Sequence, residues 1–440
     1  MLMSRRKLVI LGGGGFRVPL VYGALLGPDS PVDEVVLHDV DTARLSAITR
    51  VLRAFEGGPR VDATTDLTSA LTGASFVFSA IRVHGLEGRV IDERVALNEG
   101  VLGQETVGAG GIAYGLRTVP VAQAIARRIS LVAPEAWVIN FTNPAGLVTE
   151  AMAQHLGGRV IGICDSPSAL VRRVVRALGA SPSSVEIEYA GLNHLGWLTA
   201  VRENGIDLLP RLLTTPSRAE SIEEGRLFGA ARLQALGAVP NEYLHYYYDH
   251  SSVVRGLLEA PQTRGEYLLH QQRDVYARLV AADGDPLQAW QAARRDRDAT
   301  YMATEGLGER DAATVEGGGY EAVALALMSA IASGRPAQLI LNVRNRGTLP
   351  ELDDDAVVEV PCIVDGSGAR PLPTSLFAGG VDLVRRIKAT DRAVLEAAAT
   401  GSRAVAVRAM ASHPLIDSVP VARRLIAGYQ EQLPELGYLS

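Results

Sequence analysis

Short apolar runs alternate with amphipathic helical patterns through roughly the first 165 residues of the chain. The helical patterns, such as 42–55 and 119–133, lie between the runs, and Pro134 ends the second of them. This alternation predicts a parallel sheet with helices on both faces, which binds its ligands at the carboxyl ends of its strands. The predicted strands are 8–11, 34–37, 60–63, 75–80, 137–141 and 160–164.

From about residue 183 the pattern changes to a mixture of strands and helices. The predicted strands are 185–190, 195–202, 338–344 and 356–364, and the predicted helices are 219–236, 266–282, 375–411 and 419–432. We therefore expect an α/β protein in which residues 1–180 form a doubly wound domain around a parallel sheet. Residues 181–440 are expected to form a second, mixed α+β domain.

The first apolar run leads directly into a turn of four glycines and then into a helical pattern, and the second run ends at an acid. This order is typical of dinucleotide-binding units, in which glycines let the backbone approach a pyrophosphate and the acid binds ribose hydroxyls. The spacing departs from G-x-G-x-x-G, so a tight turn in another doubly wound fold is the alternative. The residues expected to bind NAD here are Gly12, Gly13, Gly14, Phe16, Arg17 and Asp39.

Charge and cysteine content narrow the class of protein. The net charge of −6 gives no electrostatic case for nucleic acid or for a membrane surface. The chain has only 2 cysteines, which argues against a disulfide scaffold and for a reducing compartment. The apolar run at 8–11 is too short for a signal peptide, and no later segment approaches the ~20 apolar residues of a membrane span. We expect a cytoplasmic protein.

Cys164 and His194 are the first pair to consider for chemistry. Cys164 ends a predicted strand, and His194 precedes the strand at 195–202. A thiolate and an imidazole suit a borderline or soft divalent metal, and two protein ligands would leave positions for substrate oxygens. The alternative, which these two residues alone favour, is an inert buried cysteine and a hydrogen-bonded histidine between domains.

Polar residues follow two of the predicted strands. Asp165 could act as a general acid or lie beside a metal, or it could cap the helix that starts near Pro167. Asn140 and Asn143 could bind cofactor or substrate hydroxyls, or they could form Asx turns at the strand end. The residues alone leave these alternatives open.

Two further segments stand out. The run from Tyr243 to Tyr248 contains four tyrosines, in a chain with few aromatic residues. A tyrosine beside a cation can act as a base, although such clusters more often pack between domains. The segment 103–111 is too rich in glycine for a core, which suggests close backbone approach to a ligand.

Together these segments resemble glycoside hydrolase family 4, the glycosidases that need NAD and a divalent metal, over nearly the full chain. The segments 341–345 and 355–362 look most like the 6-phospho-β-glucosidase branch. The other matching stretches are 12–14 with Pro19; 81–83, 85–87 and 92–94; 103–106 with 110–112; 139–145; 162–164 with Pro167; 191–194 with Trp197; and 243–248.

The resemblance implies a Rossmann-like NAD-binding domain, arranged with the second domain as in lactate and malate dehydrogenases. It also implies a cycle outside the usual two-carboxylate scheme. NAD oxidises C3 of the sugar, a tyrosine removes the acidified C2 proton, and the leaving group is eliminated. Water then adds and the hydride returns. The metal, expected to be Mn²⁺ because of its thiolate ligand, stabilises the enediolate.

The resemblance also assigns roles to residues of this chain. Cys164 and His194 match the metal ligands, and Tyr247 matches the base, with Tyr246 as the second choice. Substrate contacts are expected from Arg82, Asn143 and Asn193, and Asn140 is expected at the cofactor.

Asp165 stands where the β branch has asparagine and resembles the acid of the 6-phospho-α branch, so the anomeric preference stays open. Glu316 stands where the family often has a basic residue, which leaves the 6-phosphate requirement open as well. The family's members lead us to expect a homodimer or homotetramer. The functional alternatives are a sugar or hydroxy-acid dehydrogenase and a non-catalytic NAD sensor.

Overall fold

The computed structural model describes residues 5–281, 284–299 and 319–440, and the strands in this part of the chain form one 13-stranded sheet. Its first half is parallel and has the order β3-β2-β1-β4-β5-β6, the strand order of a Rossmann fold. This confirms the doubly wound arrangement that the sequence predicts. These strands are β1 (Lys7–Leu11), β2 (Glu34–His38), β3 (Arg60–Thr64), β4 (Phe76–Ser79), β5 (Trp137–Asn140) and β6 (Val160–Gly162).

Alternate residues of β1 enter different cores, which explains its continuous apolar sequence. Leu8 and Ile10 belong to the largest hydrophobic cluster, whereas Val9 and Leu11 belong to a second cluster. Strands buried on both faces have no solvated side on which polar residues could alternate.

The second half of the chain extends the same sheet with antiparallel strands. β11 pairs with β6 and β12, and β12 pairs in turn with β7, so the sheet continues across residue 180. The division into domains at that residue stays a prediction. These strands are β7 (Val185–Leu192), β8 (Leu195–Glu203), β9 (Ile206–Asp207), β10 (Val239–Pro240), β11 (Ala337–Arg344), β12 (Val357–Asp365) and β13 (Gly368–Pro371).

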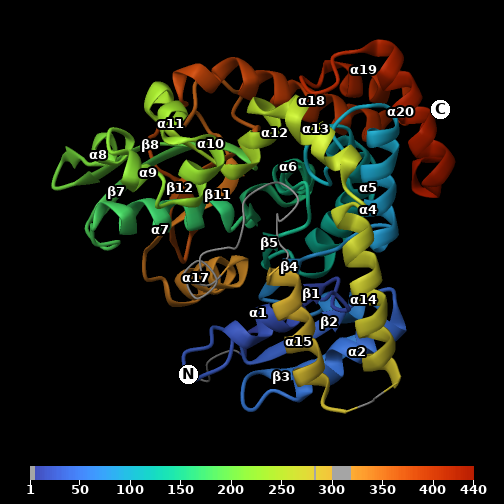
Figure 1. Cartoon of the computed structure of the whole chain (residues 1–440). Helices are drawn as coiled ribbons and strands as arrows, with labels where there is room; N and C mark the ends of the chain where they lie inside the picture. Colours follow the sequence, from blue (N-terminus) through green and yellow to red (C-terminus); the bar gives the residue numbers. More distant parts are fainter. Residues whose placement is uncertain (1–4, 282–283, 300–318) are drawn as a thin grey trace.

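Helices cover the sheet, and three of them return from the second half to the first. Figure 1 shows α14 running from α4 down to α2, with α15 beside it and α17 near α1. The helices of the first half are α1 (Val18–Ala24), α2 (Thr42–Arg53), α3 (Leu67–Leu71), α4 (Gly85–Asn98), α5 (Gly108–Val132), α6 (Ala145–Leu156) and α7 (Ser166–Leu178). Those of the second half are α8 (Leu209–Leu213), α9 (Pro216–Ala219), α10 (Glu223–Phe228), α11 (Ala230–Leu236), α12 (His245–Tyr248), α13 (His250–Glu259), α14 (Arg264–Ala281), α15 (Pro286–Ala299), α17 (Tyr320–Ser333), α18 (Val381–Thr400), α19 (Arg403–Ser412) and α20 (Val419–Gln432).

Two predicted helices are divided in the structure. The segment 219–236 contains α10, α11 and the end of α9, and Gly229 with φ +84° separates α10 from α11. The segment 375–411 contains α18 and most of α19, separated at Gly401 with φ +69°. Glycine adopts this left-handed backbone without a steric penalty, which ends a helix cleanly.

The expectation that glycines 103–111 exclude this segment from the core is wrong. Residues 108–111 are buried in the first turn of α5, which begins well before the predicted position 119. A Cβ on Gly110 would lie 2.2 Å from the carbonyl oxygen of Gln104, and one on Gly103 would lie 2.4 Å from that of Glu93. Glycine is required here because the chain packs closely against itself.

Candidate functional site

The turn after β1 has the shape that the glycines predict. Gly12 has φ +77°, and a Cβ there would lie 2.5 Å from the carbonyl oxygen of Ala80. The backbone N–H of Gly14 donates to Asp39 Oδ2 at 2.8 Å, which connects the turn to the end of β2. The turn and the acid therefore lie together, as a dinucleotide site requires.

Three aromatic residues from the second half of the chain donate hydrogen bonds to backbone carbonyl oxygens of this turn and of the residues just after it. Tyr276 of α14 donates its hydroxyl to the carbonyl oxygen of Gly14 at 2.5 Å, and Trp290 of α15 donates Nε1–H to that of Phe16 at 2.8 Å. Tyr320 of α17 donates to the carbonyl oxygen of Arg17 at 3.0 Å. Local sequence patterns gave no signal for these contacts, because they join segments more than 250 residues apart.

Several arginine side chains gather beside the turn. Burial lowers the pKa of Arg297 well below its usual range, and the guanidinium groups of Arg17, Arg264 and Arg89 lower it further. Arg17 also lies over the rings of Phe141 and Tyr320. Positive charge concentrated beside the turn favours the binding of a multiply charged anion there.

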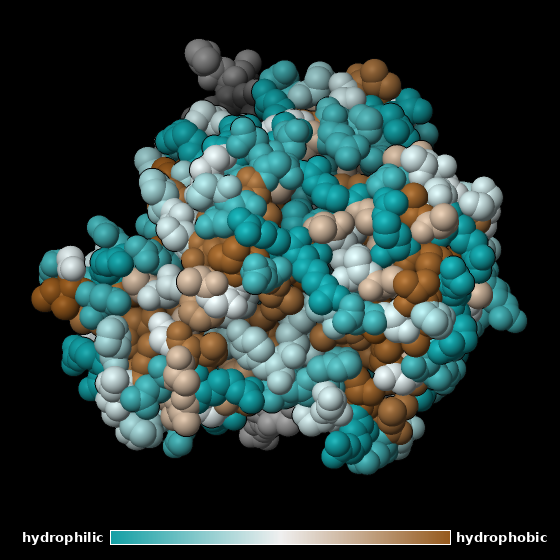
Figure 2. Space-filling view, turned by 90° about the horizontal axis from the view of Figure 1, so that it is seen from above, coloured by the Kyte–Doolittle hydropathy of each residue, from teal (hydrophilic) through white to brown (hydrophobic). Residues whose placement is uncertain are grey.

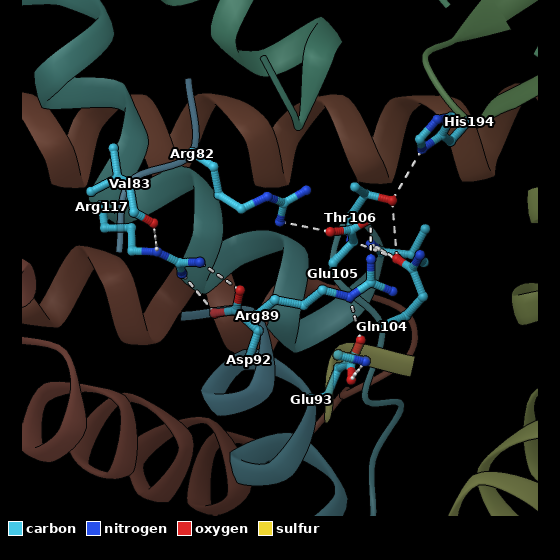
Figure 3. Close-up of polar contacts among 12 residues, drawn as sticks. Arg82, Val83, Arg89, Asp92, Glu93, Gln104, Glu105, Thr106, Arg117 and His194 are labelled. Carbon is cyan, nitrogen blue, oxygen red and sulfur yellow. Dashed lines mark hydrogen bonds and ion pairs between the residues drawn. The ribbon is translucent and has the colours of Figure 1, made fainter. Parts of the chain in front are cut away.

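Arg82 follows β4 and belongs to an ion-pair network (Figure 3). Its Nη1 donates to Glu105 Oε2 at 2.8 Å, and Arg89 Nη1 lies 2.9 Å from Glu105 Oε1. Burial would raise the pKa of Glu105, but these two guanidinium groups hold it well below its usual range. Nearby, Arg117 pairs with the buried Asp92 and donates Nε–H to the carbonyl oxygen of Val83, which fixes the segment next to Arg82.

Asn140, the last residue of β5, and Asn143 differ in their surroundings. The Asn140 side chain is fully buried: its Nδ2 donates to the carbonyl oxygens of Thr142 and Ala145 and to Thr149 Oγ1, and its Oδ1 accepts from Thr142 N–H. Both donor hydrogens are thus engaged in holding the turn, which is the Asx-turn alternative. Asn143 is half-buried and precedes Pro144 in a cis peptide bond. Cofactor and substrate contacts of these residues stay predictions.

Cys164 and Asp165 lie just after β6, separated from its last residue by Ile163. Burial raises the pKa of the Cys164 thiol well above its usual value, and the carboxylates of Glu359 and Asp165 raise it further. Asp165 stands at the N-cap position of α7, yet in the described structure its side chain makes no capping hydrogen bond. The capping alternative for Asp165 is therefore absent here, and its carboxylate is half-buried.

His194 lies in the two-residue turn that joins β7 to β8. Its φ is 62°, and the neighbouring Asn193 donates Nδ2–H to the buried Glu359 at 3.2 Å. Burial lowers the pKa of His194 to about 4, although the carboxylates of Asp165 and Glu105 act in the opposite direction. Asp165 is thus close enough to influence both Cys164 and His194 electrostatically.

The tyrosines of the 243–248 run occupy distinct positions. Tyr243 stacks on His194, with ring centroids 3.6 Å apart and ring planes 2° from parallel. Tyr246 is 2% exposed and packs in a hydrophobic cluster with Leu97 and Leu102. Tyr247 lines a cavity with His194. Its pKa is raised far above the usual value, mainly by burial and further by the nearby Asp391 carboxylate. Only Tyr243 is stacked on the His194 ring among the described residues.

That cavity lies beside His194. Its volume is about 60 Å³, enough for ordered water. Its lining includes Asn193, His194, Tyr247, Asp391 and His413, and the ring centroids of Tyr247 and His413 lie 6.1 Å apart. Tyr247 and His194 therefore face the same cavity.

The donor set at Cys164 and His194 fits a divalent cation. A bound cation deprotonates a thiol that otherwise stays protonated, and a neutral imidazole offers a lone pair. In the described residues no group of three or more His, Cys, Asp or Glu side chains is arranged to hold a metal. The site with two protein ligands and further ligands from substrate stays a prediction. Glu316 and residues 317–318 lie outside the described residues.

Several residues of this site have no individual signal in the sequence. Tyr243 stands out only as part of the aromatic run, and local patterns give no role to Gln104, Thr106 or Glu359. The segment 103–106 and the segment 355–362 both belong to the matching motifs, and this signal could have identified them. The contacts of Tyr276 and Trp290 depend on tertiary packing alone.

The outer surface shows no large apolar face in the view of Figure 2, where hydrophobic residues occur in small groups among hydrophilic ones. The most exposed large hydrophobic residues, such as Val40, Leu131 and Ile206, are far apart in sequence. Within the described part of the chain, every helix is too short or too polar to span a lipid bilayer.

Comparisons with known proteins support the family resemblance that the sequence motifs indicate. The chain matches a model described as family 4 glycosyl hydrolase over residues 7–180, and one described as the C-terminal domain of that family over residues 189–416. It is 32% identical to a probable 6-phospho-beta-glucosidase of Bacillus subtilis, over 96% of this chain and 94% of that protein.

Solved structures agree with the fold. A crystal structure of a 6-phospho-alpha-glucosidase from gut microorganisms, in complex with NAD and Mn²⁺, is 26% identical with a TM-score of 0.79 and covers 97% of this chain and 98% of that chain. Malate dehydrogenase from Plasmodium falciparum, at 11% identity, shares the fold with a TM-score of 0.50 over 89% of this chain and 98% of that chain. The chain belongs to family 4 of the glycosyl hydrolases.

Proposed function

We propose that the protein hydrolyses 6-phosphorylated β-glucosides by oxidation, elimination, addition and reduction, with NAD and a divalent cation, Mn²⁺. The observation that carries this proposal is the arrangement around His194. A tyrosine ring lies face to face with the imidazole, and one carboxylate, Asp165, acts on both His194 and Cys164.

Separate sets of residues would bind NAD and the divalent cation. The turn at Gly12–Gly14 and Asp39 would hold NAD, and Cys164 with His194 would hold the cation. When bound, NAD supplies reversible oxidation of the sugar and the cation supplies positive charge that makes a neighbouring carbon acid stronger. Phe16 and Arg17 belong to the same turn and are proposed to contact NAD.

Tyr243 is our choice for the base that removes the C2 proton. The base must lie beside the cation, since the acidified carbon carries an oxygen that faces it, and Tyr243 is the tyrosine stacked on His194. Tyr247, the residue that the motif favours, lines the same cavity as His194, and burial disfavours its ionised form. Asp165 is proposed as the acid that protonates the leaving group, because its carboxylate caps no helix in the described structure.

The arginines beside the glycine turn support an anionic substrate. Arg17 lies over the rings of Phe141 and Tyr320, and Arg297 lies over the ring of Phe16 in the glycine turn segment. Their positive charge would favour a phosphate group there. Arg82, Asn143 and Asn193 are proposed to contact the sugar.

An assay with nitrophenyl glucosides tests the proposal. The protein would be incubated with Mn²⁺, NAD and a thiol, and hydrolysis measured for the α and β anomers with and without a 6-phosphate. We expect the 6-phosphorylated β-glucoside to be cleaved fastest, with no net NADH. Release of NADH in proportion to substrate would instead indicate a dehydrogenase, and no hydrolysis of any of the four compounds would refute the proposal.

A preference for the α anomer is the second possibility, and Asp165 favours it. An acid at this position is characteristic of the 6-phospho-α branch, whose members also include the structure that is 26% identical to this chain. The same assay decides between the anomers.

We also propose a homodimer or homotetramer in the cytoplasm. Both cysteines are free and buried, and a thiolate ligand at Cys164 needs reducing conditions. Light scattering of the purified protein would give the oligomeric state.

A further inference from the structure

We propose that Gln104 and Thr106 act as positioning residues that keep the proton of the His194 imidazole on Nδ1, so that Nε2 presents its lone pair to the cation. This inference rests on the proposed function, because it concerns the same metal ligand. The contacts form a chain from Gln104 through Thr106 to His194, drawn in Figure 3.

The direction of each hydrogen bond follows from the first one. The backbone N–H groups of Thr106 and Val107 donate to one side-chain atom of Gln104, at 2.5 and 2.7 Å. Two N–H donors can share only an acceptor, so this atom is the amide oxygen and not the amide nitrogen.

The Thr106 hydroxyl lies 3.0 Å from the same oxygen, and a carbonyl oxygen can only accept, so the hydroxyl donates to Gln104. Its single hydrogen is thereby used. Toward His194 Nδ1, 3.1 Å away, the Thr106 oxygen can offer only a lone pair. His194 must therefore donate from Nδ1, and a neutral imidazole then has its lone pair on Nε2.

Other contacts hold the ring while this chain sets its tautomer. The hairpin turn fixes the backbone of His194 at φ 62°, and the Tyr243 ring fixes the plane of the imidazole. Gln104 is itself held, because it is buried and caps the segment just before α5. The acceptor for Nδ1–H is thus built into the protein before a metal binds, which lowers the cost of ordering the ligand.

Mn²⁺ binding to the metal-free protein, measured by electron paramagnetic resonance of the free ion, tests this inference. Thr106→Val keeps the shape of the side chain but removes the acceptor, and loss of such an outer partner typically weakens metal binding about 10- to 100-fold. Thr106→Ser keeps the hydroxyl and is expected to bind Mn²⁺ within about threefold of the wild type. Gln104→Met should also weaken binding, because it frees the Thr106 hydroxyl to donate to Nδ1.

A second measurement needs no substitution at these positions. Nitrogen NMR of the metal-free protein with ¹⁵N-labelled histidine reports which ring nitrogen carries the proton, and the His194→Asn variant identifies the signals. We expect an unprotonated Nε2 in the wild type. An unprotonated Nδ1, or equal Mn²⁺ affinity for Thr106→Val and the wild type, would overturn the inference.

Failure of the inference and failure of the proposed function give different results. If Cys164→Ser and His194→Asn leave Mn²⁺ binding unchanged, the metal site itself is wrong. If those two variants lose Mn²⁺ and Thr106→Val does not, only the positioning role is wrong.

Discussion

Asn140 is the last residue of one strand of the parallel sheet and Asp165 follows another, yet their side chains are engaged differently. Asn140 uses its amide within its own turn, whereas Asp165 makes no capping bond in the described structure. Sequence alone leaves both residues open, because each type serves equally well in turns and in catalysis. At this scale the hydrogen-bond partners decide which polar side chain remains available for substrate.

The identity of the tyrosine that acts as the base is also a prediction about a single residue. Tyr243→Phe should lower kcat by about 10²- to 10⁴-fold, because it removes the proton acceptor beside the cation. Exchange of the substrate C2 hydrogen with deuterated water should disappear with it. Tyr246→Phe and Tyr247→Phe serve as matched variants in the same run and should retain the exchange. Loss of exchange in Tyr247→Phe alone would restore the residue that the motif favours.

At the scale of elements, α14, α15 and α17 connect the second half of the chain to the glycine turn. Each donates one side-chain hydrogen bond to a carbonyl oxygen of the turn, at Gly14, Phe16 and Arg17. A buried carbonyl without a partner costs about 1–3 kcal/mol, so these helices stabilise the conformation that the turn needs. The nucleotide site therefore depends on segments far from the classical motif.

Tyr276→Phe should consequently weaken NAD binding several-fold and lower the free energy of unfolding by about 1–3 kcal/mol, since the carbonyl oxygen of Gly14 loses its donor. Tyr267→Phe is the matched control on the same helix, because Tyr267 donates to Asp296 and not to the turn. Fluorescence titration with NAD and urea unfolding would measure both effects. Equal NAD affinities for the two variants would show that α14 does not support the turn.

At the scale of the whole molecule, burial determines how stability depends on pH. Burial lowers the pKa of His413 to about 3, and the charges of Arg386 and His250 act in the same direction. The titratable groups beside it in the cavity are Asp391, Lys388, Tyr247 and His194. In the unfolded chain a histidine takes up its proton near its ordinary pKa of about 6.5.

The unfolded state therefore binds more protons than the folded state between pH 6.5 and pH 3. Stability from His413 is complete above that range and is lost as the pH falls through it, by about 2 kcal/mol at pH 5. The difference in unfolding free energy between pH 7 and pH 5 should be smaller by this amount in His413→Asn. His270→Asn, at an exposed position, is the control and should behave as the wild type. Urea titrations at both pH values measure the difference.

Much of the fold follows from the sequence by itself. Strands buried on both faces leave continuous apolar runs, and helices between them leave a 3.6-residue period, so the parallel half was predictable. The glycine turn and the acid after β2 were predictable too, because close backbone approach admits only glycine. The motifs likewise identified the family, which the matched relatives confirm.

Tertiary structure alone decided how the site is assembled. The antiparallel strands that extend the sheet, the stacking of Tyr243 on His194 and the bonds from Tyr276 and Trp290 join residues far apart in the chain. Local patterns record the burial of a residue but not the identity of its partner, since many side chains satisfy the same periodicity. The direction of the hydrogen bonds from Gln104 to His194 became visible only once those atoms were in contact.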